Sequence, residues 1–530
     1  ANGVIVVTTK KGKSGATRIT YDGFVNFQGR PQYDYFPVLN SAQFIQASRE
    51  TFDPVRQPYS TVTTYNPNTG VSTGLTPDRQ ILYDIHRGVL TEAQGKAKLD
   101  SLSGLNNVGQ IGELFYRPAM VMNHTLSIAG GSDKHTFYNS LAYTNNRSAT
   151  PGSKDETFKI NTRQDFAFNR FLKAYLIADL NYQSMSSKNH KAINNQFLPY
   201  QLFQNAAGKS LDINYMGYLS EHQRPSIEGL SQIALAYNPF EDMETGQGNS
   251  KNFTGRFNSG LTIDIIKGLR LEGVYGYVRG NYRTQQYFDH SNYQQRINVV
   301  NFAKIAADGN IVYHLPTTGG EYSVNNATME NWSVRNQLNY TMSWKDNQHQ
   351  LSALLGQEAQ EQITTVNTSR VHGYDQVLQT YAMLDYKTLS STGVNNPILP
   401  ISGASSKLPV NSYFGELESV PRSRFTSYYA NAGYTFARKY TLNASWRNDQ
   451  SNLFGINKSA QRRPVWSVGL KWTLTQEPWM EKMKPTVNLL ALRATYGITG
   501  NSPAPGFASS KDVLAARADP NAPGGSSLSI

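Results

Sequence analysis

Histidines, carboxylates and glycine-rich turns are the features of this sequence that could support chemistry. The nine histidines are dispersed, and none has the H-x-x-x-H spacing of a zinc site. Asp308-Gly309-Asn310 offers oxygen ligands, but the remaining ligands and the closing glutamate of a calcium loop are missing. Neither a helix nor a lysine follows Gly497–Gly500, so this turn is no phosphate cradle. With no cysteine and no Ser/His/Asp order, the sequence predicts a protein that is not an enzyme and holds no metal or cofactor.

Aromatic side chains in the long polar stretches are the more informative chemical feature. Tyrosine and phenylalanine rings stack on sugar rings and pack at protein interfaces. The candidates for contact with a ligand or a partner lid are Tyr33, Tyr35, Phe36, Tyr200, Tyr215, Tyr218 and Tyr374. The alternative is that each ring folds back onto its own loop or onto the rim of the protein.

Alternation of apolar and polar residues predicts the strands that must position these groups. In 253–265, Phe253, Phe257 and Leu261 share one face, whereas Arg256 and Asp264 share the other. A tilted membrane-crossing strand of roughly ten residues has this pattern, because one face meets lipid and the other a polar lumen. Comparable segments lie near 17–27, 123–130, 135–145, 158–168, 171–182, 253–265, 269–279, 332–344, 350–360, 425–436, 440–447, 465–474 and 488–497.

The connections between these segments are of two kinds. Short turns are predicted at 130–134, 169–170, 266–268, 345–349 and 437–439, and long polar stretches at 28–122, 184–251, 280–331 and 361–424. Short periplasmic turns and long extracellular loops are typical of a bacterial outer-membrane barrel. Within the loops, Ser41 is predicted to cap a helix, and 77–102 also has helical character.

Composition agrees with an all-β fold that forms part of a transmembrane antiparallel barrel. Of the 530 residues only 17% are charged while 12% are aromatic, and no apolar run is long enough for a membrane-spanning helix. The net charge of +12 comes from scattered lysines and arginines, so nucleic acid is not an expected partner. By parity, Arg256, Asp264, Arg335, Glu358 and Arg447 face inward, either as ordinary solvated wall residues or as contacts for what occupies the lumen.

Two segments far apart in the sequence have recognisable motifs. The first contains Ala1, Asn2, Gly3, Val4, Ile5, Thr8, Thr9, Lys10, Lys11 and Gly12. The second contains Arg493, Tyr496, Gly497, Thr499, Gly500 and Asn501. The first resembles the strand that closes the plug domain, and the second a barrel motif, of the SusC/RagA family of TonB-dependent outer-membrane proteins. Residues 446–451 resemble a family hairpin with Gln450 in place of the usual glycine, and 477–480 also match.

The resemblance implies a plug inside a barrel of about 22 strands, with a SusD-like lipoprotein over its extracellular mouth. It implies import of a large nutrient, a glycan or a peptide, driven by TonB through a segment absent from this chain. The domains expected are the last plug strand (1–15), an incomplete barrel in outer-membrane lipid (16–501) and a loop-like tail (502–530), with both ends read as truncations.

A protein of another class would share some of these features. A secreted or surface-attached all-β adhesin that binds glycans would also be rich in aromatics and alternating strands. It would carry no lipid-facing belt, and it would not need loops that are long on one side only. A passive porin is a further alternative, but a plug-like strand leading into the first barrel strand argues against it.

Overall fold

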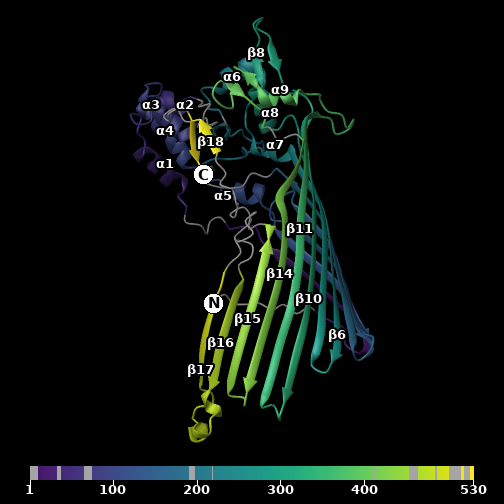
Figure 1. Cartoon of the computed structure of the whole chain (residues 1–530). Helices are drawn as coiled ribbons and strands as arrows, with labels where there is room; N and C mark the ends of the chain where they lie inside the picture. The colour runs from purple at the N-terminus through teal and green to yellow at the C-terminus, as the bar shows by residue number, and fades with distance from the viewer. Residues whose placement is uncertain are drawn as a thin grey trace.

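Thirteen strands form one antiparallel sheet in which every strand pairs with its neighbours in chain order (Figure 1). The computed structural model describes residues 10–32, 38–64, 75–189, 197–217, 219–409, 414–452, 464–483, 486–500, 515–518 and 526–529. The strands of the sheet are β1 (Gly15–Gln28), β2 (Ala119–Gly131), β3 (His135–Arg147), β4 (Lys154–Ala167), β5 (Leu172–Lys188), β6 (Gly246–Ile266), β7 (Leu269–Phe288), β10 (Gly320–Trp344), β11 (His349–Tyr374), β14 (Phe414–Phe436), β15 (Tyr440–Ser451), β16 (Val465–Thr473) and β17 (Ala491–Ile498).

The strands predicted from alternation are all present in this sheet, but several are longer than predicted. β10 begins at Gly320, β11 ends at Tyr374 and β14 begins at Phe414. The predictions of loops over 280–331 and 361–424 were therefore wrong for the parts that continue as strand. The same holds for 119–122, 184–188 and 246–251 within the loops predicted over 28–122 and 184–251. Beyond the apolar belt neither face is apolar, so the hydrophobic alternation disappears while the backbone pairing continues.

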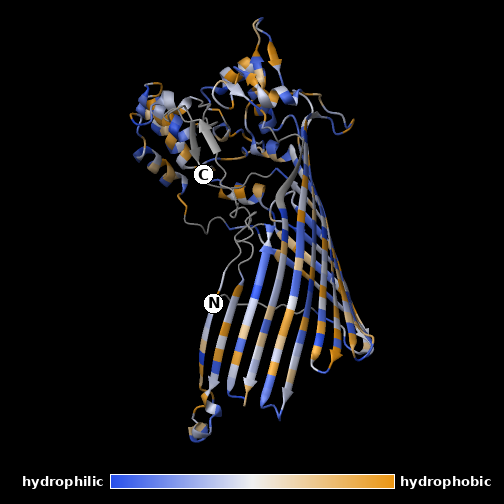
Figure 2. Cartoon of the chain, in the orientation of Figure 1, coloured by the Kyte–Doolittle hydropathy of each residue, from blue (hydrophilic) through white to orange (hydrophobic). Residues whose placement is uncertain are grey.

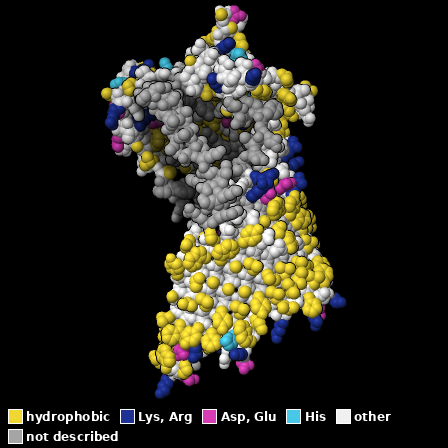
Figure 3. Space-filling model, viewed as in Figure 1, with side chains coloured by type: hydrophobic (Ala, Val, Ile, Leu, Met, Phe, Trp, Pro, Cys, Tyr) yellow, Lys and Arg dark blue, Asp and Glu magenta, His cyan; other side chains and the backbone are white. Residues whose placement is uncertain are grey.

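The register places apolar side chains on one common face. Leu338 in β10 lies opposite Leu271 in β7 and Leu355 in β11. Leu355 is 61% exposed, and Trp332 and Trp344 are exposed on the same face. Figure 3 shows hydrophobic side chains gathered into an apolar belt over the lower part of the sheet, where the ribbon of Figure 2 carries many hydrophobic positions along the strands.

The belt is about as tall as the hydrocarbon core of a membrane. Trp332 and Trp344 are twelve residues apart on β10, which corresponds to roughly 40 Å along the strand. A strand tilt of about 40° reduces this to about 30 Å along the membrane normal, the thickness of the apolar core. We call the opposite face the lumen face.

Helices gather at one end of the sheet, above the apolar belt (Figure 1). We call this part the extracellular module, after the side on which the long loops of such a barrel are expected. It contains α1 (Ser41–Glu50), α2 (Tyr59–Thr63), α3 (Pro77–His86), α4 (Glu92–Ser103), α5 (Val108–Gln110), η2 (Ile111–Phe115), η3 (Asn214–Met216), α6 (Arg224–Ser231), α7 (Pro239–Glu244), α8 (Tyr293–Asn301) and α9 (Tyr386–Ser391). Short pairs β8 (Ala303–Ile305) with β9 (Ile311–Tyr313), and β12 (Val394–Asn395) with β13 (Ser405–Ser406), complete it. No helix of the described residues is both long and apolar enough to cross a bilayer.

The first helix is capped one residue earlier than predicted. The Asn40 side chain accepts a hydrogen bond from Gln43 N, and Asn40 N donates one to the Gln43 side-chain oxygen. Ser41 instead donates to the Leu105 carbonyl at 2.6 Å and is buried. The helical character predicted over 77–102 belongs to two helices, because the chain leaves α3 after His86 and re-enters α4 at a capping box on Thr91.

Two other predictions need correction or qualification. Residues 446–451, matched to a family hairpin, continue β15 as a regular strand, so no turn forms there. The tail predicted to be loop-like contains a two-stranded pair, β18 (Ala515–Ala518) and β19 (Ser526–Ser529). The predicted plug strand falls largely on residues 1–9, which lie outside the described residues.

Candidate functional site

The buried apolar core of the described residues lies mainly in the extracellular module. One cluster joins η2, α8 and the segments between β5 and β6, with Phe115, Phe203 and Val300 almost completely buried. A second cluster joins α1, α3 and α4 around Ile45, Leu99 and Tyr200. The module is therefore a packed body that can hold side chains in fixed positions over the strand ends.

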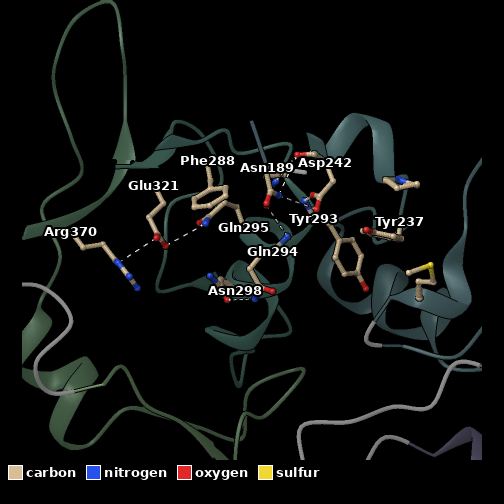
Figure 4. A pocket seen from close by; sticks show the side chains of 13 residues that line it. Asn189, Tyr237, Asp242, Phe288, Tyr293, Gln294, Gln295, Asn298, Glu321 and Arg370 are labelled. Atoms are coloured by element: carbon tan, nitrogen blue, oxygen red, sulfur yellow. Dashed lines mark hydrogen bonds and ion pairs between the residues drawn. The ribbon is translucent and has the colours of Figure 1, made fainter. Parts of the chain in front are cut away.

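A cavity of about 540 Å³ lies where this module meets the extracellular ends of four strands (Figure 4). The strands contribute Asn189 after β5, Phe288 at the end of β7, Glu321 near the start of β10 and Arg370 near the end of β11. In β7, β10 and β11 these residues have the parity opposite to the apolar belt, so they are on the lumen face. The remaining lining residues are Met216, Tyr237, Pro239, Asp242, Asn292, Tyr293, Gln294, Gln295 and Asn298.

A buried carboxylate forms one side of this cavity. Glu321 is only 7% exposed, and its Oε1 lies 3.3 Å from Arg370 Nε. Gln295 Nε2 donates to Glu321 Oε2 at 3.3 Å, and His372 Nδ1 lies 3.7 Å from the same oxygen. A buried charge needs such partners, because desolvation otherwise strongly disfavours it. Glu321 is thereby held in place, and Arg370 keeps further N–H groups available for a ligand.

The other side of the cavity is built by helix capping. Asp242 Oδ1 accepts a hydrogen bond from Tyr293 N at 2.8 Å, which joins α7 to the first turn of α8. Asn292 caps α8 by accepting from Gln294 N. Gln294 and Asn298, one turn apart on α8, are hydrogen-bonded to each other at 3.0 Å. The capping fixes the helix, and the helix presents an amide pair to the cavity.

The cavity presents groups that suit a solute with several hydroxyl or amide groups. Its amides and carboxylates provide donors and acceptors, and the Tyr237 and Tyr293 rings pack edge to face at 5.1 Å beside them. Such a mixture of aromatic surface and placed polar groups is typical of a binding pocket. Among the described residues no group of His, Asp and Glu side chains could hold a metal ion.

The charged residues predicted to face inward form part of the lumen face lower in the wall. Tyr429 lies over Gly356, where an added Cβ would be 2.2 Å from the ring, and Arg447 is 5.5 Å from the ring centroid. Arg447 also pairs with Asp449 at 2.8 Å. Asp264 pairs with Arg270 at 2.7 Å. The lumen face is thus polar, and some of its charged side chains form ion pairs with each other.

The aromatic candidates fall into different environments. Tyr33, Tyr35, Phe36 and Tyr218 lie outside the described residues. Tyr200 is 2% exposed, and its hydroxyl donates to Asp78 at 2.5 Å, so it packs within its own module. Burial raises the pKa of Tyr200 and of Tyr215, which packs against the same core. Tyr374 stacks on Tyr322 at 4.6 Å near the strand ends.

The two family motifs are placed only in part. Of the first, the structure describes Lys10, Lys11 and Gly12, and Gly12 packs so tightly on the Phe137 backbone that an added Cβ would lie 2.3 Å from its carbonyl oxygen. Of the second, Arg493 and Tyr496 lie in β17. Gly497 approaches the Trp466 carbonyl in the same way as Gly12 approaches Phe137. Thr499 and Gly500 follow β17, and Asn501 lies outside the described residues.

Sequence reasoning missed the cavity residues Asp242, Glu321 and Arg370. Each falls in a stretch predicted to be a long loop, where no alternation indicated a face. In the sequence, Gly320 lies next to Glu321 and Gly373 lies close to Arg370. These glycines do not indicate that Glu321 and Arg370 meet in space.

No family model matches the chain. TonB-dependent receptor P39 of Formosa agariphila is 23% identical over 506 residues, which cover 94% of this chain and 38% of that receptor. TonB-dependent receptor P26 of the same organism is 24% identical over 394 residues, covering 73% of this chain and 33% of that receptor. The chain therefore spans well under half the length of these curated relatives.

Among solved structures, the RagAB peptide importer in its closed-closed state matches with a TM-score of 0.61 and 17% identity. That match covers 98% of this chain and 51% of the other chain. The open-open state of the same importer gives a TM-score of 0.59. The resemblance to SusC/RagA-type TonB-dependent proteins, drawn first from two motifs, is confirmed by these matches, and the fold is that of their barrel wall.

Proposed function

We propose that this chain forms part of a TonB-dependent importer of the bacterial outer membrane that takes up a large hydrogen-bonding nutrient. The observation that carries the proposal is the division of one sheet into an outward apolar belt and a polar lumen face, with a cavity above the lumen (Figures 3 and 4). The receptors that match the chain along most of its length support the TonB-dependent character.

The substrate we propose first is an oligosaccharide. Carboxylate, amide and guanidinium groups around aromatic rings suit a solute with many hydroxyl groups, and these are the groups of the cavity. A peptide is the second candidate, because amide side chains and the Glu321–Arg370 pair can also bind a peptide backbone and its charged ends. The name of the RagAB peptide importer favours this second candidate by analogy of fold alone.

The partners follow from the same proposal. A SusD-like surface lipoprotein would cover the extracellular module, and TonB would act through a part of the protein outside this chain. Within the chain, residues 1–15 would be the end of the plug, 16–501 barrel wall and 502–530 a connecting segment. The protein itself would supply shape and hydrogen-bonding groups, and no covalent step would take place.

The proposal is tested first by purification of the full-length protein from an outer membrane. We expect a species that requires detergent, shifts its electrophoretic mobility on heating and co-purifies with a lipoprotein. A protein that stays soluble without detergent and brings down no partner would overturn the importer and favour a surface adhesin.

The cavity is tested by removing its amide pair with Gln294→Ala and Asn298→Ala together. Each lost hydrogen bond costs about 1 kcal/mol, so binding should weaken roughly 10- to 30-fold. Calorimetric titration with panels of oligosaccharides and peptides measures this effect and identifies the class that binds. Gln46→Ala, which removes an exposed amide on α1, is the matched control and should leave affinity unchanged. Equal affinity of both variants would place the binding site elsewhere.

A further inference from the structure

Basic side chains occupy the outward face immediately above the apolar belt. Lys251 in β6 and Arg283 in β7 are directly opposite each other in the register. They share the outward parity of Phe253 and Tyr277, both of which are exposed at the top of the belt. Figure 3 shows Lys and Arg side chains together with Asp and Glu side chains above the apolar surface.

The pairing of Lys251 with Arg283 is unfavourable by itself. Like charges directly opposite in a sheet destabilise the pairing of the two strands. Neither side chain belongs to any of the ion pairs that the described residues form, and both are exposed. An anion bound between them would remove this repulsion.

A groove of about 280 Å³ lies beside this pair on the same outward face. Two cations and one carboxylate, Lys251, Lys154 and Glu156, line it together with Ser184, Met185, Ser186, Asn249, Ser250 and Gln285. Lys154 pairs with Glu156 at 3.0 Å, which leaves the charge of Lys251 free for a ligand. The groove therefore combines positive charge with several uncharged donors.

The charged zone continues around the wall with more cations than carboxylates. Arg279 lies 3.6 Å from Glu330. Arg422 and Arg424 share the single carboxylate of Glu361, at 3.0 and 3.4 Å. Glu361 is directly opposite Trp332, the residue that marks the upper edge of the apolar belt. Three arginines of this zone thus share only two carboxylates.

We propose that the groove around Lys251, Lys154 and Arg283 binds the phosphate-bearing headgroup of a lipid in the outer leaflet. The inference rests on the membrane placement in the proposed function, which puts the zone directly above the apolar belt at the headgroup layer. A phosphate offers negative charge to Lys251 and Arg283 and acceptor oxygens to the hydroxyls and amides of the groove. The lipid would hold the wall at a fixed depth in the membrane.

The experiment compares variants of the detergent-purified full-length protein, with phosphatidic acid as the probe and native mass spectrometry as the readout. Lys251→Gln with Arg283→Gln should weaken binding roughly 20- to 30-fold, since each cation near a membrane surface contributes about a factor of five. Lys251→Arg with Arg283→Lys should retain binding. Arg256→Gln with Lys471→Gln removes two charges from the lumen face and should bind as the parent does.

Several outcomes would overturn the inference. Equal phosphatidic acid binding by the outward and lumen variants would contradict it, and so would equal binding of phosphatidylcholine. Displacement of the lipid by an equal concentration of inorganic phosphate would indicate a site for a free anion. A protein that stays soluble without detergent would contradict the proposed function. A detergent-solubilised barrel in which the Lys251→Gln, Arg283→Gln variant binds lipid as the parent does would contradict this inference alone.

Discussion

At the scale of single residues, one buried carboxylate of the extracellular module is satisfied by two specific partners. Asp78 is 1% exposed, and its two carboxylate oxygens accept hydrogen bonds from the hydroxyls of Ser48 and Tyr200. The two partners come from α1 and from the segment before β6, far apart in the sequence. One carboxylate thus ties separate parts of the module together.

Tyr200→Phe should destabilise the module by about 1–3 kcal/mol, because a buried carboxylate oxygen loses its donor while the ring is kept. Unfolding of the module with increasing denaturant, followed by near-ultraviolet circular dichroism, measures the change. Tyr381→Phe removes the hydroxyl of a half-exposed tyrosine and is the control. Equal midpoints for the two variants would show that the Asp78–Tyr200 bond contributes nothing.

Sequence reasoning reached individual residues only where a regular face existed. The inward parity of Arg335 and Arg447 followed from alternation, because a lipid-facing stripe fixes the register of each strand. The cavity residues Glu321 and Arg370 lie beyond the stripe, so their meeting depends on the fold of distant loops. Tyr200, chosen as a candidate for ligand contact, is buried by that same loop folding.

At the scale of elements, the turn between β16 and β17 is held by one carboxylate. Glu477 accepts hydrogen bonds from Lys439 Nζ at 2.9 Å, Trp472 Nε1 at 2.9 Å and Tyr440 OH at 2.7 Å. The bond from Lys439 is the largest of the effects that lower the pKa of Glu477 to about 2, followed by those from Trp472 and Tyr440. These contacts fasten the turn to two neighbouring strands.

The lowered pKa gives the turn a definite pH dependence. A carboxyl whose folded pKa lies below its unfolded value of 4.5 stabilises the fold fully above that value, and the contribution is lost as pH falls towards 2. The thermal midpoint of the detergent-folded protein should therefore fall less steeply between pH 5 and about 2 for Glu477→Gln than for the parent. Glu481→Gln changes an exposed carboxylate of the same turn and serves as control. If the thermal midpoint of Glu477→Gln depends on pH as that of the parent does, Glu477 does not stabilise the turn.

Strands were the most predictable elements and loops the least. Each strand was predicted from the alternation of lipid-facing apolar residues with lumen-facing polar residues. This alternation ends where the strand leaves the apolar layer of the membrane. The helix at 41–50 was recognised, but its cap was assigned to Ser41 because Asn40 and Ser41 are both good capping residues. The extended upper ends of β10, β11 and β14 needed long-range pairing, which no local pattern indicates.

At the scale of the whole molecule, the chain divides into a wall and a cap. The wall carries its apolar surface outward (Figure 3), and the cap, which is the extracellular module, carries the buried core. A soluble β-sandwich has the reverse arrangement, with apolar faces packed against each other. The direction of the apolar faces is therefore the feature that distinguishes an importer wall from an adhesin.

The direction of these faces can be measured by single-cysteine scanning, since the 530 residues contain no cysteine. Spin labels placed one at a time along 253–263 of the full-length protein in lipid bilayers would report access to oxygen, which concentrates in lipid, and to a water-soluble nickel complex. We predict that Phe253→Cys, Phe257→Cys and Leu261→Cys favour oxygen while Arg256→Cys and Asn258→Cys favour nickel, with a period of two residues. Equal access to nickel on both faces, or no alternation, would contradict the central claim that this sheet is a membrane-spanning wall.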